Sequence, residues 1–491
     1  MLDRYNLIDE KWIPSVEREF ISLKDVFSFS KLANIGGNPI EKIALFKFLL
    51  AICQIVIRPK TNRIIRNMSE SEISIRVLEY FEQNYDKFDL YGDNPIFQVK
   101  GAVQAKIKTF SEVSIEISTG NTSVLYSSQL SRDFSEREKA LMLLTMLSFA
   151  PGGKKTDNSV ILSPGYGSKS NEKGNPSSSK AGPSLGFKGY LHAFLFGKTI
   201  IETLKLNLFS EEYINNCDMF PFGVGNAPWI NPPKGEDCDQ ARILKGSYMG
   251  TLMPYCRFML LTDSGVHYTE GIKHDSIYDG KQDLSMTVMK HGKKPKCLWV
   301  DPNVCLLSNF KHFFNTNENS ETSFYCPQII NGLSLSNKNM DISLWAGGLK
   351  ISSKAGEQYC SGDDDYFEDE LSLDKRFFNE KFYDLFIKYV DIIKNYEGVL
   401  YYSVRNYYEE LKLDHSHYIK KATQYFWFML TDQIVLFFDL IESDEEKAIK
   451  SFLFKKVYQI YNEICPATSA VRILAFAKHS PGLKKDTSKN E

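Results

Sequence analysis

The stretch PIEKIALFKFLLAICQIVIR, residues 39–58, decides the fold prediction, because its apolar residues recur at helical spacing and indicate a helix buried in a protein core. Its longest apolar run, residues 48–57, is too short to span a membrane. The N-terminal residues 1–12 lack the apolar segment of a signal peptide. We therefore expect a soluble cytoplasmic protein without a membrane partner.

Outward from this helix, the first part of the chain mixes helix and strand patterns. Residues 135–150 predict a second helix, because Ser135 and Glu138 have the spacing of a capping box. Residues 94–102 alternate like a strand, and the stretch from residue 189 predicts a strand that leads into a helix. Short apolar runs separated by turn residues continue to residue 352, which favours a large mixed α/β domain over 1–360.

The last part of the chain has a different pattern. Residues 357–374 hold eight acidic residues and no basic one, which predicts an acidic linker over 361–374. From 375 to 480 the only glycine is Gly398. Helical patterns there cover 376–395, 397–412, 415–442, 445–463 and 466–479. We predict a C-terminal four-helix bundle over 375–491, and hence an α+β protein.

The composition restricts the kinds of partner. The 491 residues include 59 Lys and Arg against 61 Asp and Glu, a net charge of -2, so any contact with nucleic acid has to be local. The nine cysteines contain no CxxC pair, which argues against a zinc ribbon or a disulfide framework and favours a reducing compartment.

Motifs for enzyme chemistry are missing from the sequence. Neither HExxH nor GxSxG occurs, and GSKS at 167–170 lacks the order of a phosphate-binding loop. The acidic run Asp363–Asp365 is more typical of a solvated linker than of a metal site. We expect no enzymatic activity, no cofactor and no metal.

Two basic segments stand out against the neutral background. Residues 150–190 hold six lysines, two acids and eight glycines, and include the 24-residue segment 163–186, which has almost no apolar residues. The second basic segment is KHGKKPK, residues 290–296. Lysines supply charge to phosphates, and glycines let a backbone approach a surface closely. A flexible basic linker and a solvated hairpin tip are the alternative interpretations.

Seven segments in order resemble the CasA family, the large subunit of the type I-E CRISPR Cascade complex. They are NLIDEKWIP, NPIFQVKG, APGGKKTDNSVILSPGYG, GYLHAFLFGKTIIETLKLNL, EGIKH, LSMTVMKHGKKPKCLWVDP and LWAGGLKISSKAGEQY. The resemblance spans nearly the whole chain. It implies a non-catalytic subunit that reads the protospacer-adjacent motif of double-stranded target DNA, helps open the duplex and recruits a helicase-nuclease. The implied partners also include the other Cascade subunits and the guide RNA.

The resemblance also implies individual site residues for DNA. The family reads the motif from the minor groove, whose code is degenerate. The glycine loop matches Gly152 and Gly153, followed by Lys154 and Lys155, and the lysine that enters the groove matches Lys273.

Further contacts are implied elsewhere in the chain. A wedge residue is expected between Gln328 and Asn339, where Asn331 fits best by spacing, although Gly332 stands where a glutamine is expected. The second basic segment, residues 290–296, adds Lys290, Lys293 and Lys294 as expected DNA contacts. A loop over 120–129, with Asn121 and Tyr126, is expected to touch the guide RNA and neighbouring subunits, and a core role is the alternative for the tyrosine.

Two other classes of function compete with this interpretation. A nucleic-acid-processing nuclease requires carboxylates that converge in the fold. A scaffold subunit without DNA contact predicts that Lys273 and the lysines of 290–296 are scattered rather than gathered on one face. The segment 163–186 is expected to be mobile in the free protein and to order on assembly.

Overall fold

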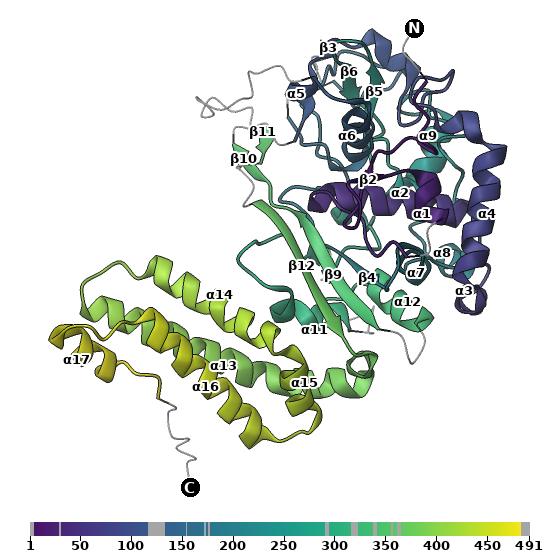
Figure 1. Ribbon diagram of the computed structural model, residues 1–491. Coiled ribbons are helices and arrows are strands. Elements are labelled where there is room, and N and C mark those ends of the chain that lie inside the picture. The colour runs from purple at the N-terminus through teal and green to yellow at the C-terminus, as the bar shows by residue number, and fades with distance from the viewer. Residues whose placement is uncertain are drawn as a thin grey trace. The chain divides into compact units, whose positions relative to one another are not determined.

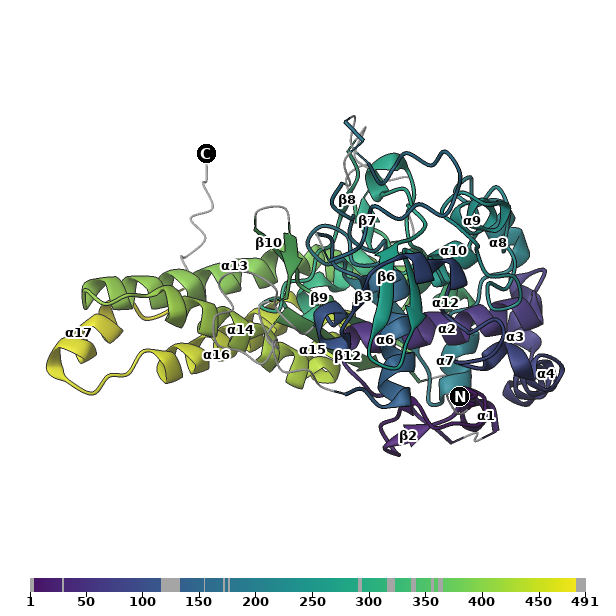
Figure 2. The same ribbon diagram turned by 90° about the horizontal axis from the view of Figure 1, so that it is seen from above.

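The computed structural model describes residues 4–482 except for 29–30, 116–132, 154, 171–172, 175–176, 290–293, 316–322, 337–340, 355–356 and 361–364. The chain forms two compact units. The first comprises residues 1–302 and 316–370, and the second comprises 303–315 and 371–491 (Figures 1 and 2).

The first unit is a mixture of helices and short antiparallel strands. Its helices are α1 (Leu23–Ser28), α2 (Pro39–Ile57), α3 (Asn62–Asn67), α4 (Glu70–Gln83), α5 (Phe110–Val113), α6 (Glu136–Phe149), α7 (Ile200–Leu206), α8 (Glu211–Asn215), α9 (Asp239–Lys245), α10 (Met249–Leu252) and α12 (Pro327–Leu335). Its strands are β1 (Ile13–Pro14), β2 (Phe20–Ile21), β3 (Ile107–Lys108), β4 (His192–Phe196), β5 (Arg257–Leu261), β6 (Val266–Glu270), β7 (Val288–Met289), β8 (Lys296–Cys297), β9 (Ile342–Leu349), β10 (Ser352–Lys354) and β11 (Glu357–Tyr359).

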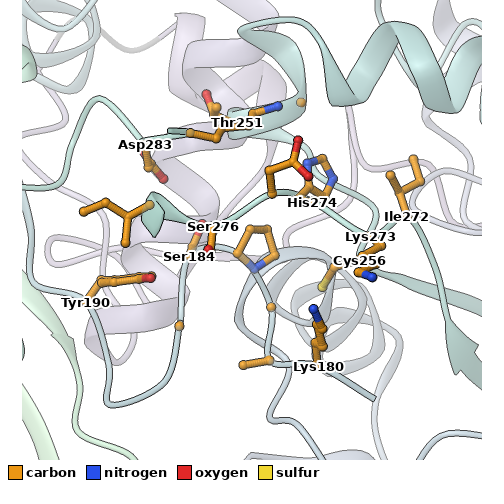
Figure 3. A pocket seen from close by; sticks show the side chains of 18 of the residues that line it. Lys180, Ser184, Tyr190, Thr251, Cys256, Ile272, Lys273, His274, Ser276 and Asp283 are labelled. Atoms are coloured by element: carbon orange, nitrogen blue, oxygen red, sulfur yellow. The ribbon is translucent and has the colours of Figure 1, made fainter. Parts of the chain in front are cut away.

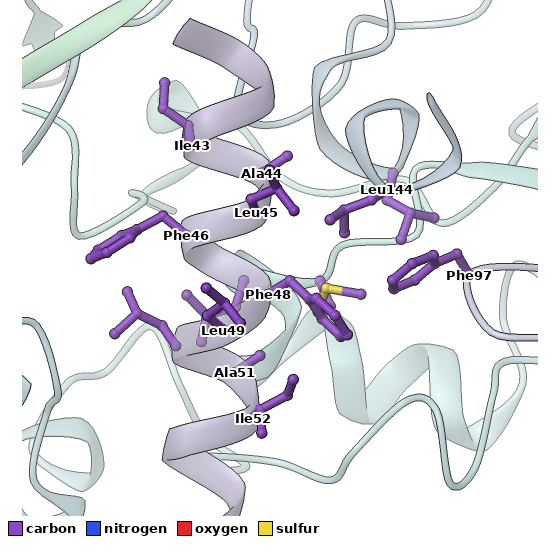
Figure 4. Packing of buried hydrophobic residues seen from close by; sticks show 14 of the residues in the cluster. Ile43, Ala44, Leu45, Phe46, Phe48, Leu49, Ala51, Ile52, Phe97 and Leu144 are labelled. Atoms are coloured by element: carbon purple, nitrogen blue, oxygen red, sulfur yellow. The ribbon is translucent and has the colours of Figure 1, made fainter. Parts of the chain in front are cut away.

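Helix α2 is the buried helix that the sequence predicts. Asn38 caps it in a capping box with Glu41, and Pro39 stands at its first turn, where a missing N–H costs nothing. Phe48 packs against Trp12 and, edge to face at 4.9 Å between ring centroids, against Phe97 (Figure 4). Each such buried side chain contributes about 1.5–3 kcal/mol, so this helix organises the core.

Two three-stranded sheets contribute side chains to this core. One has the strand order β3-β6-β5, and the other has the order β12-β9-β4, with β12 spanning Tyr366–Leu373. In the first sheet, Arg257 at the start of β5 lies opposite Glu270 at the end of β6. This pairing places the residues that follow β6, including Lys273, at one end of the β5–β6 hairpin.

The second unit is a helical bundle with an aromatic core. Its helices are α11 (Phe310–Phe313), α13 (Glu380–Glu410), α14 (Ser416–Asp432), α15 (Ile434–Glu442), α16 (Glu446–Ile464) and α17 (Ala470–Lys478). The ring of Phe438 packs against those of Phe310 and Phe382, with distances between ring centroids of 5.1 and 4.9 Å. The fold class predicted from sequence, a mixed α/β part followed by long C-terminal helices, is confirmed.

Several element boundaries differ from the prediction. The predicted helices 376–395 and 397–412 form one continuous helix, α13, which runs for 31 residues and includes Gly398. The predicted helix 415–442 is instead divided at Gln433, which has a non-helical backbone. Residues 94–102 form no strand. Phe97 takes a left-handed backbone there, with φ of 65°.

The domain boundaries also differ. Residues 366–373 of the expected acidic linker form strand β12, which pairs with β9, so the described part of 361–374 is not a free linker. Residues 303–315 join the bundle, although the sequence assigns them to the first domain, because Phe310 packs into its aromatic core.

Candidate nucleic-acid interface

Lys273 is held by the backbone that continues from strand β6. The Gly271 N–H donates to the Cys256 carbonyl at 2.9 Å, and the Ile272 N–H donates to the Tyr255 carbonyl at 2.9 Å. These bonds extend the pairing of β5 and β6 by two residues, so the backbone that carries Lys273 is fixed. The Lys273 side chain is half-buried and lines a cleft.

The glycine segment after helix α6 lies against the end of the long segment. Gly153 and Ser179 exchange two backbone hydrogen bonds of 3.1 Å. Gly153 has a positive φ of 135°, a backbone conformation that glycine adopts readily and other residues rarely adopt. The Gly152 N–H donates to the Gln358 side chain at 2.8 Å. The amides of both glycines are therefore occupied by protein acceptors, and they hold residues 152–153 in place rather than facing outward.

Arg257 joins these two segments to the hairpin. This buried guanidinium donates to the Pro151 carbonyl at 2.9 Å, to the Lys180 carbonyl at 2.6 Å and to the Tyr268 hydroxyl at 3.2 Å. Hydrogen bonds from a charged donor contribute about 1.5–3 kcal/mol each. The glycine segment and EGIKH, about 120 residues apart in sequence, thus meet in space through one side chain.

The cleft that results has a volume of about 140 Å³ (Figure 3). Lys180, Lys273, His274, Ser276 and Asp279 are among its lining residues. Burial lowers the pKa of His274 to about 3, and its ring donates to the Pro254 carbonyl at 2.6 Å, so this histidine is neutral near pH 7. The positive charge at the cleft therefore comes from lysines and from the buried guanidinium of Arg257.

The long segment 163–186 is tied to the core in the residues that the structure describes. Lys169 forms a 2.5 Å ion pair with Glu236, and both side chains are buried, at 1% and 0% exposure. The same carboxylate accepts the N–H groups of Leu162 and Ser163 at 3.0 and 2.8 Å. The expectation of a mobile segment is wrong for these described residues, because a buried charge pair holds the segment in place.

Asn331 has a different environment from the one expected of a wedge. Its side chain on α12 is 5% exposed, donates to the Leu208 carbonyl at 2.8 Å and accepts from Asn62 at 3.1 Å. The amide therefore holds α12 against α3 and the segment after α7, and this buried position gives DNA no group to contact.

Of the remaining predicted contacts, only Lys155 and Lys294 are described, and neither lines the cleft. Lys155 is half-buried and donates to the Ser114 carbonyl at 3.4 Å. Lys294 is exposed. The other predicted residues, Asn121, Tyr126, Lys154, Lys290 and Lys293, lie outside the described residues.

Sequence reasoning missed three residues that build this site. Lys180 was only one of six lysines in a basic segment, and nothing distinguished it from the others. Arg257 stands in the apolar strand RFMLL, and a single arginine there gave no functional signal. Glu236 is 67 positions from its partner Lys169, so no local pattern connects the two.

The described part of the chain lacks a metal-binding cluster and a membrane-spanning helix. It contains no group of three or more His, Cys, Asp or Glu side chains placed to hold a metal ion. Within the same residues, no helix is both long and apolar enough to cross a membrane.

Solved structures resemble this chain over nearly its full length. Cse1 from Thermobifida fusca matches with a TM-score of 0.74 and 16% identity, over 97% of this chain and 96% of that one. CasA from Thermus thermophilus matches with a TM-score of 0.67 and 16% identity, over 97% of each chain. A chain of a CRISPR RNA-guided surveillance complex matches with a TM-score of 0.69 and 14% identity, over 97% of this chain and 98% of that one. At these identities the likeness shows the fold alone.

The sequence comparisons give the family. A search of curated proteins finds no match. The family model for CRISPR-associated protein Cse1 matches residues 6–462, which confirms the resemblance carried by the seven sequence segments. The chain therefore belongs to the CRISPR-associated protein Cse1 family.

Proposed function

We propose that this chain is the large, non-catalytic subunit of a type I-E RNA-guided CRISPR surveillance complex. In this role it reads the protospacer-adjacent motif of double-stranded DNA through the minor groove, helps to open the duplex and recruits a helicase-nuclease. Membership of the Cse1 family supports the proposal, and so does the fold shared with a chain of an RNA-guided surveillance complex.

The observation that carries the DNA-reading role is the position of Lys273. Lys273 lines a cleft built from three distant segments, and no ion pair of its side chain is found in the part of the chain that the structure describes. The minor groove presents the acceptors N3 of adenine and O2 of thymine, and an ammonium offers three donors to them. Because that code is degenerate, recognition by Lys273 tolerates more than one motif.

The overall charge explains why such a subunit needs its complex. With a net charge of -2, the isolated chain meets few phosphates, so we expect weak binding to DNA with little sequence preference. Tight binding then depends on guide pairing in the assembled complex, where the protein reads a short motif and base pairing reads the sequence.

The test is a gel-shift series of the assembled complex over all variants of the adjacent motif. Lys273→Ala is expected to weaken binding to targets with a preferred motif by about 1–3 kcal/mol, the usual cost of a lost specific contact. Targets already unpaired beside the motif should lose less, because guide pairing then supplies the energy.

Lys188→Ala is the matched control, because Lys188 is an exposed lysine of the basic segment 150–190 that does not line the cleft. If Lys273→Ala binds both kinds of target like the parent complex, Lys273 does not read the motif. Equal binding to all motifs by the parent complex would instead favour a scaffold without a reading role.

A further inference from the structure

Strand β11 carries a buried glutamine, Gln358, that bonds to two segments far from it in sequence. Its side chain is 8% exposed. Oε1 accepts the Gly152 N–H at 2.8 Å, and Nε2 donates to the carbonyls of Gly186 and Phe187 at 3.1 and 2.9 Å. The Gln358 backbone N–H also donates to the Gly152 carbonyl at 3.1 Å. One residue therefore joins the β10–β11 hairpin to the glycine segment and to residues 186–187.

The partners of the Gln358 side chain require a carboxamide. The Gly152 N–H needs an acceptor, whereas the two carbonyls need a donor, and a glutamine side chain offers both at once. A carboxylate offers only acceptors, and an aliphatic side chain offers neither. Either replacement leaves buried backbone groups without a hydrogen-bond partner, which is costly. The residue type at this position is therefore set by three backbone groups of other segments.

The backbone that Gln358 holds is part of the cleft that contains Lys273 (Figure 3). Six residues of the segment 180–186 line this cleft, and we call this segment the cleft wall. The buried guanidinium of Arg257 holds the first residue of the wall through its carbonyl, at 2.6 Å. Gln358 holds the carbonyl of the last residue, at 3.1 Å. The wall is thus fixed at both ends by side chains from outside it.

Between these ends, the cleft wall is bonded to the last residues of helix α6 and those that follow. The Gly182 N–H donates to the Ala150 carbonyl at 2.7 Å, and the Ser184 N–H donates to the Ser148 carbonyl at 3.1 Å. A Cβ at Gly182 would collide with the Ser148 carbonyl, so the two backbones pack directly on each other. The Gln358 side chain therefore bonds both to the wall and to the segment that supports it.

We propose that Gln358 is a positioning residue for motif reading, which keeps the cleft wall in the arrangement in which Lys273 contacts the motif. Gln358 is buried and does not line the cleft, so it acts through the wall and not on DNA. Recognition sites depend on residues that lock their supporting backbone without touching the ligand. This inference rests on the proposed function, because it concerns how Lys273 is presented to the minor groove.

The test uses the assembled complex with Gln358→Glu. Gln104→Glu is the matched control, because Gln104 is exposed in the same unit and receives the same change of side chain. Gel shifts measure binding to a duplex with a preferred motif, to a duplex with a disfavoured motif, and to a target already unpaired beside the motif. The readout is the ratio of the affinities for the preferred and the disfavoured motif.

Gln358→Glu is expected to lower this ratio by about fivefold or more, the lower end of what one specific contact contributes. Binding to the target that is already unpaired should change by less than about twofold, because guide pairing then supplies the energy. Equal weakening toward all three targets would mean that Gln358 only supports the fold, and would overturn the positioning role. Gln358→Met, which adds no buried charge, provides the same measurement if the carboxylate prevents assembly.

A double variant shows whether Gln358 acts through Lys273. Residues that act as one unit give non-additive effects, whereas independent contacts add. Adding Gln358→Glu to Lys273→Ala should therefore leave the affinity ratio close to that of Lys273→Ala alone. A further loss as large as that of Gln358→Glu in the parent background would overturn the inference.

Failure of this inference is distinct from failure of the proposed function. If the parent complex discriminates motifs and Lys273→Ala lowers the ratio, but both Gln358 variants behave like Gln104→Glu, the positioning role is wrong and the proposed function stands. If the parent complex shows no motif-dependent binding, the proposed function is wrong.

Discussion

Replacing Lys169 by methionine tests how firmly the long segment is held. The change removes the ammonium from a 2.5 Å pair and leaves the Glu236 carboxylate at 0% exposure with the N–H groups of Leu162 and Ser163 as its remaining donors. Breaking a buried pair by removing one partner costs about 3–5 kcal/mol, because the other charge stays buried without compensation. We expect a loss in this range in the free energy of unfolding of the first unit.

The sign of the pH dependence follows from the same contacts. Burial alone raises the pKa of Glu236, but the hydrogen bond and charge of Lys169 outweigh burial and hold the pKa below its usual value. In Lys169→Met the burial effect dominates, so the folded pKa lies above that of the unfolded chain. Stability from such a group is present at low pH and is lost as pH rises through the folded pKa. The deficit of the variant is therefore larger at pH 8 than at pH 5.

Urea unfolding followed by tryptophan fluorescence measures this loss. Four of the five tryptophans, Trp12, Trp229, Trp299 and Trp345, belong to the first unit, so the signal reports mainly on it. Limited proteolysis should also cut within 163–186 faster in the variant than in the parent.

Two further variants complete the experiment. Lys188→Met, at an exposed position, is expected to change stability by less than about 0.5 kcal/mol. Adding Glu236→Gln to Lys169→Met should recover part of the loss, because a neutral amide can still accept the two backbone N–H groups. A deficit below about 1 kcal/mol for Lys169→Met, or no recovery in the double variant, would refute this reasoning.

Two other outcomes follow from the structure. Asp279→Asn removes a negative charge that lies near Lys180 and Lys273 and repels DNA phosphates. Gel shifts at low salt should show about two- to fivefold tighter binding to DNA of any motif, the size of an exposed charge interaction. Unchanged affinity would show that the carboxylate does not oppose DNA binding. Burial lowers the pKa of His192 to about 4 in the folded chain, whereas the same histidine has a pKa of about 6.5 in the unfolded chain. As the pH falls below about 6.5, the histidine is therefore protonated in the unfolded chain before it is protonated in the folded chain, which destabilises the fold. By pH 4 this costs about 3 kcal/mol of stability, and urea melts of His192→Gln should show a flatter pH dependence than those of the parent.

The sequence by itself determined the elements whose signals are local. The predicted helix 39–58 is α2, 39–57, and the capping box of Ser135 and Glu138 begins α6. The strand and helix expected after residue 189 are β4 and α7. These predictions succeed because helical periodicity and capping depend on residues within one or two turns of each other.

Local patterns failed where packing partners outside the segment decide the conformation. The acids of 366–373 suggested a solvated linker, but pairing with β9 makes these residues a strand. Residues 94–102 alternate like a strand, yet the bends there include a left-handed Phe97 and no ladder forms. Strand formation depends on a partner strand, and the sequence of the segment itself does not specify where that partner lies.

For the candidate site as well, the sequence identified some residues and only the tertiary structure identified the others. The family resemblance, carried by segments in order along the chain, selected Gly152, Gly153 and Lys273 from the sequence alone. Only the tertiary structure decided that Lys180 joins Lys273, that Arg257 ties their segments together, and that Asn331 is buried. The physical reason is that buried hydrogen bonds and charge pairs connect groups far apart in sequence. Their partners are chosen by the three-dimensional packing of the whole unit, which no single stretch of residues encodes.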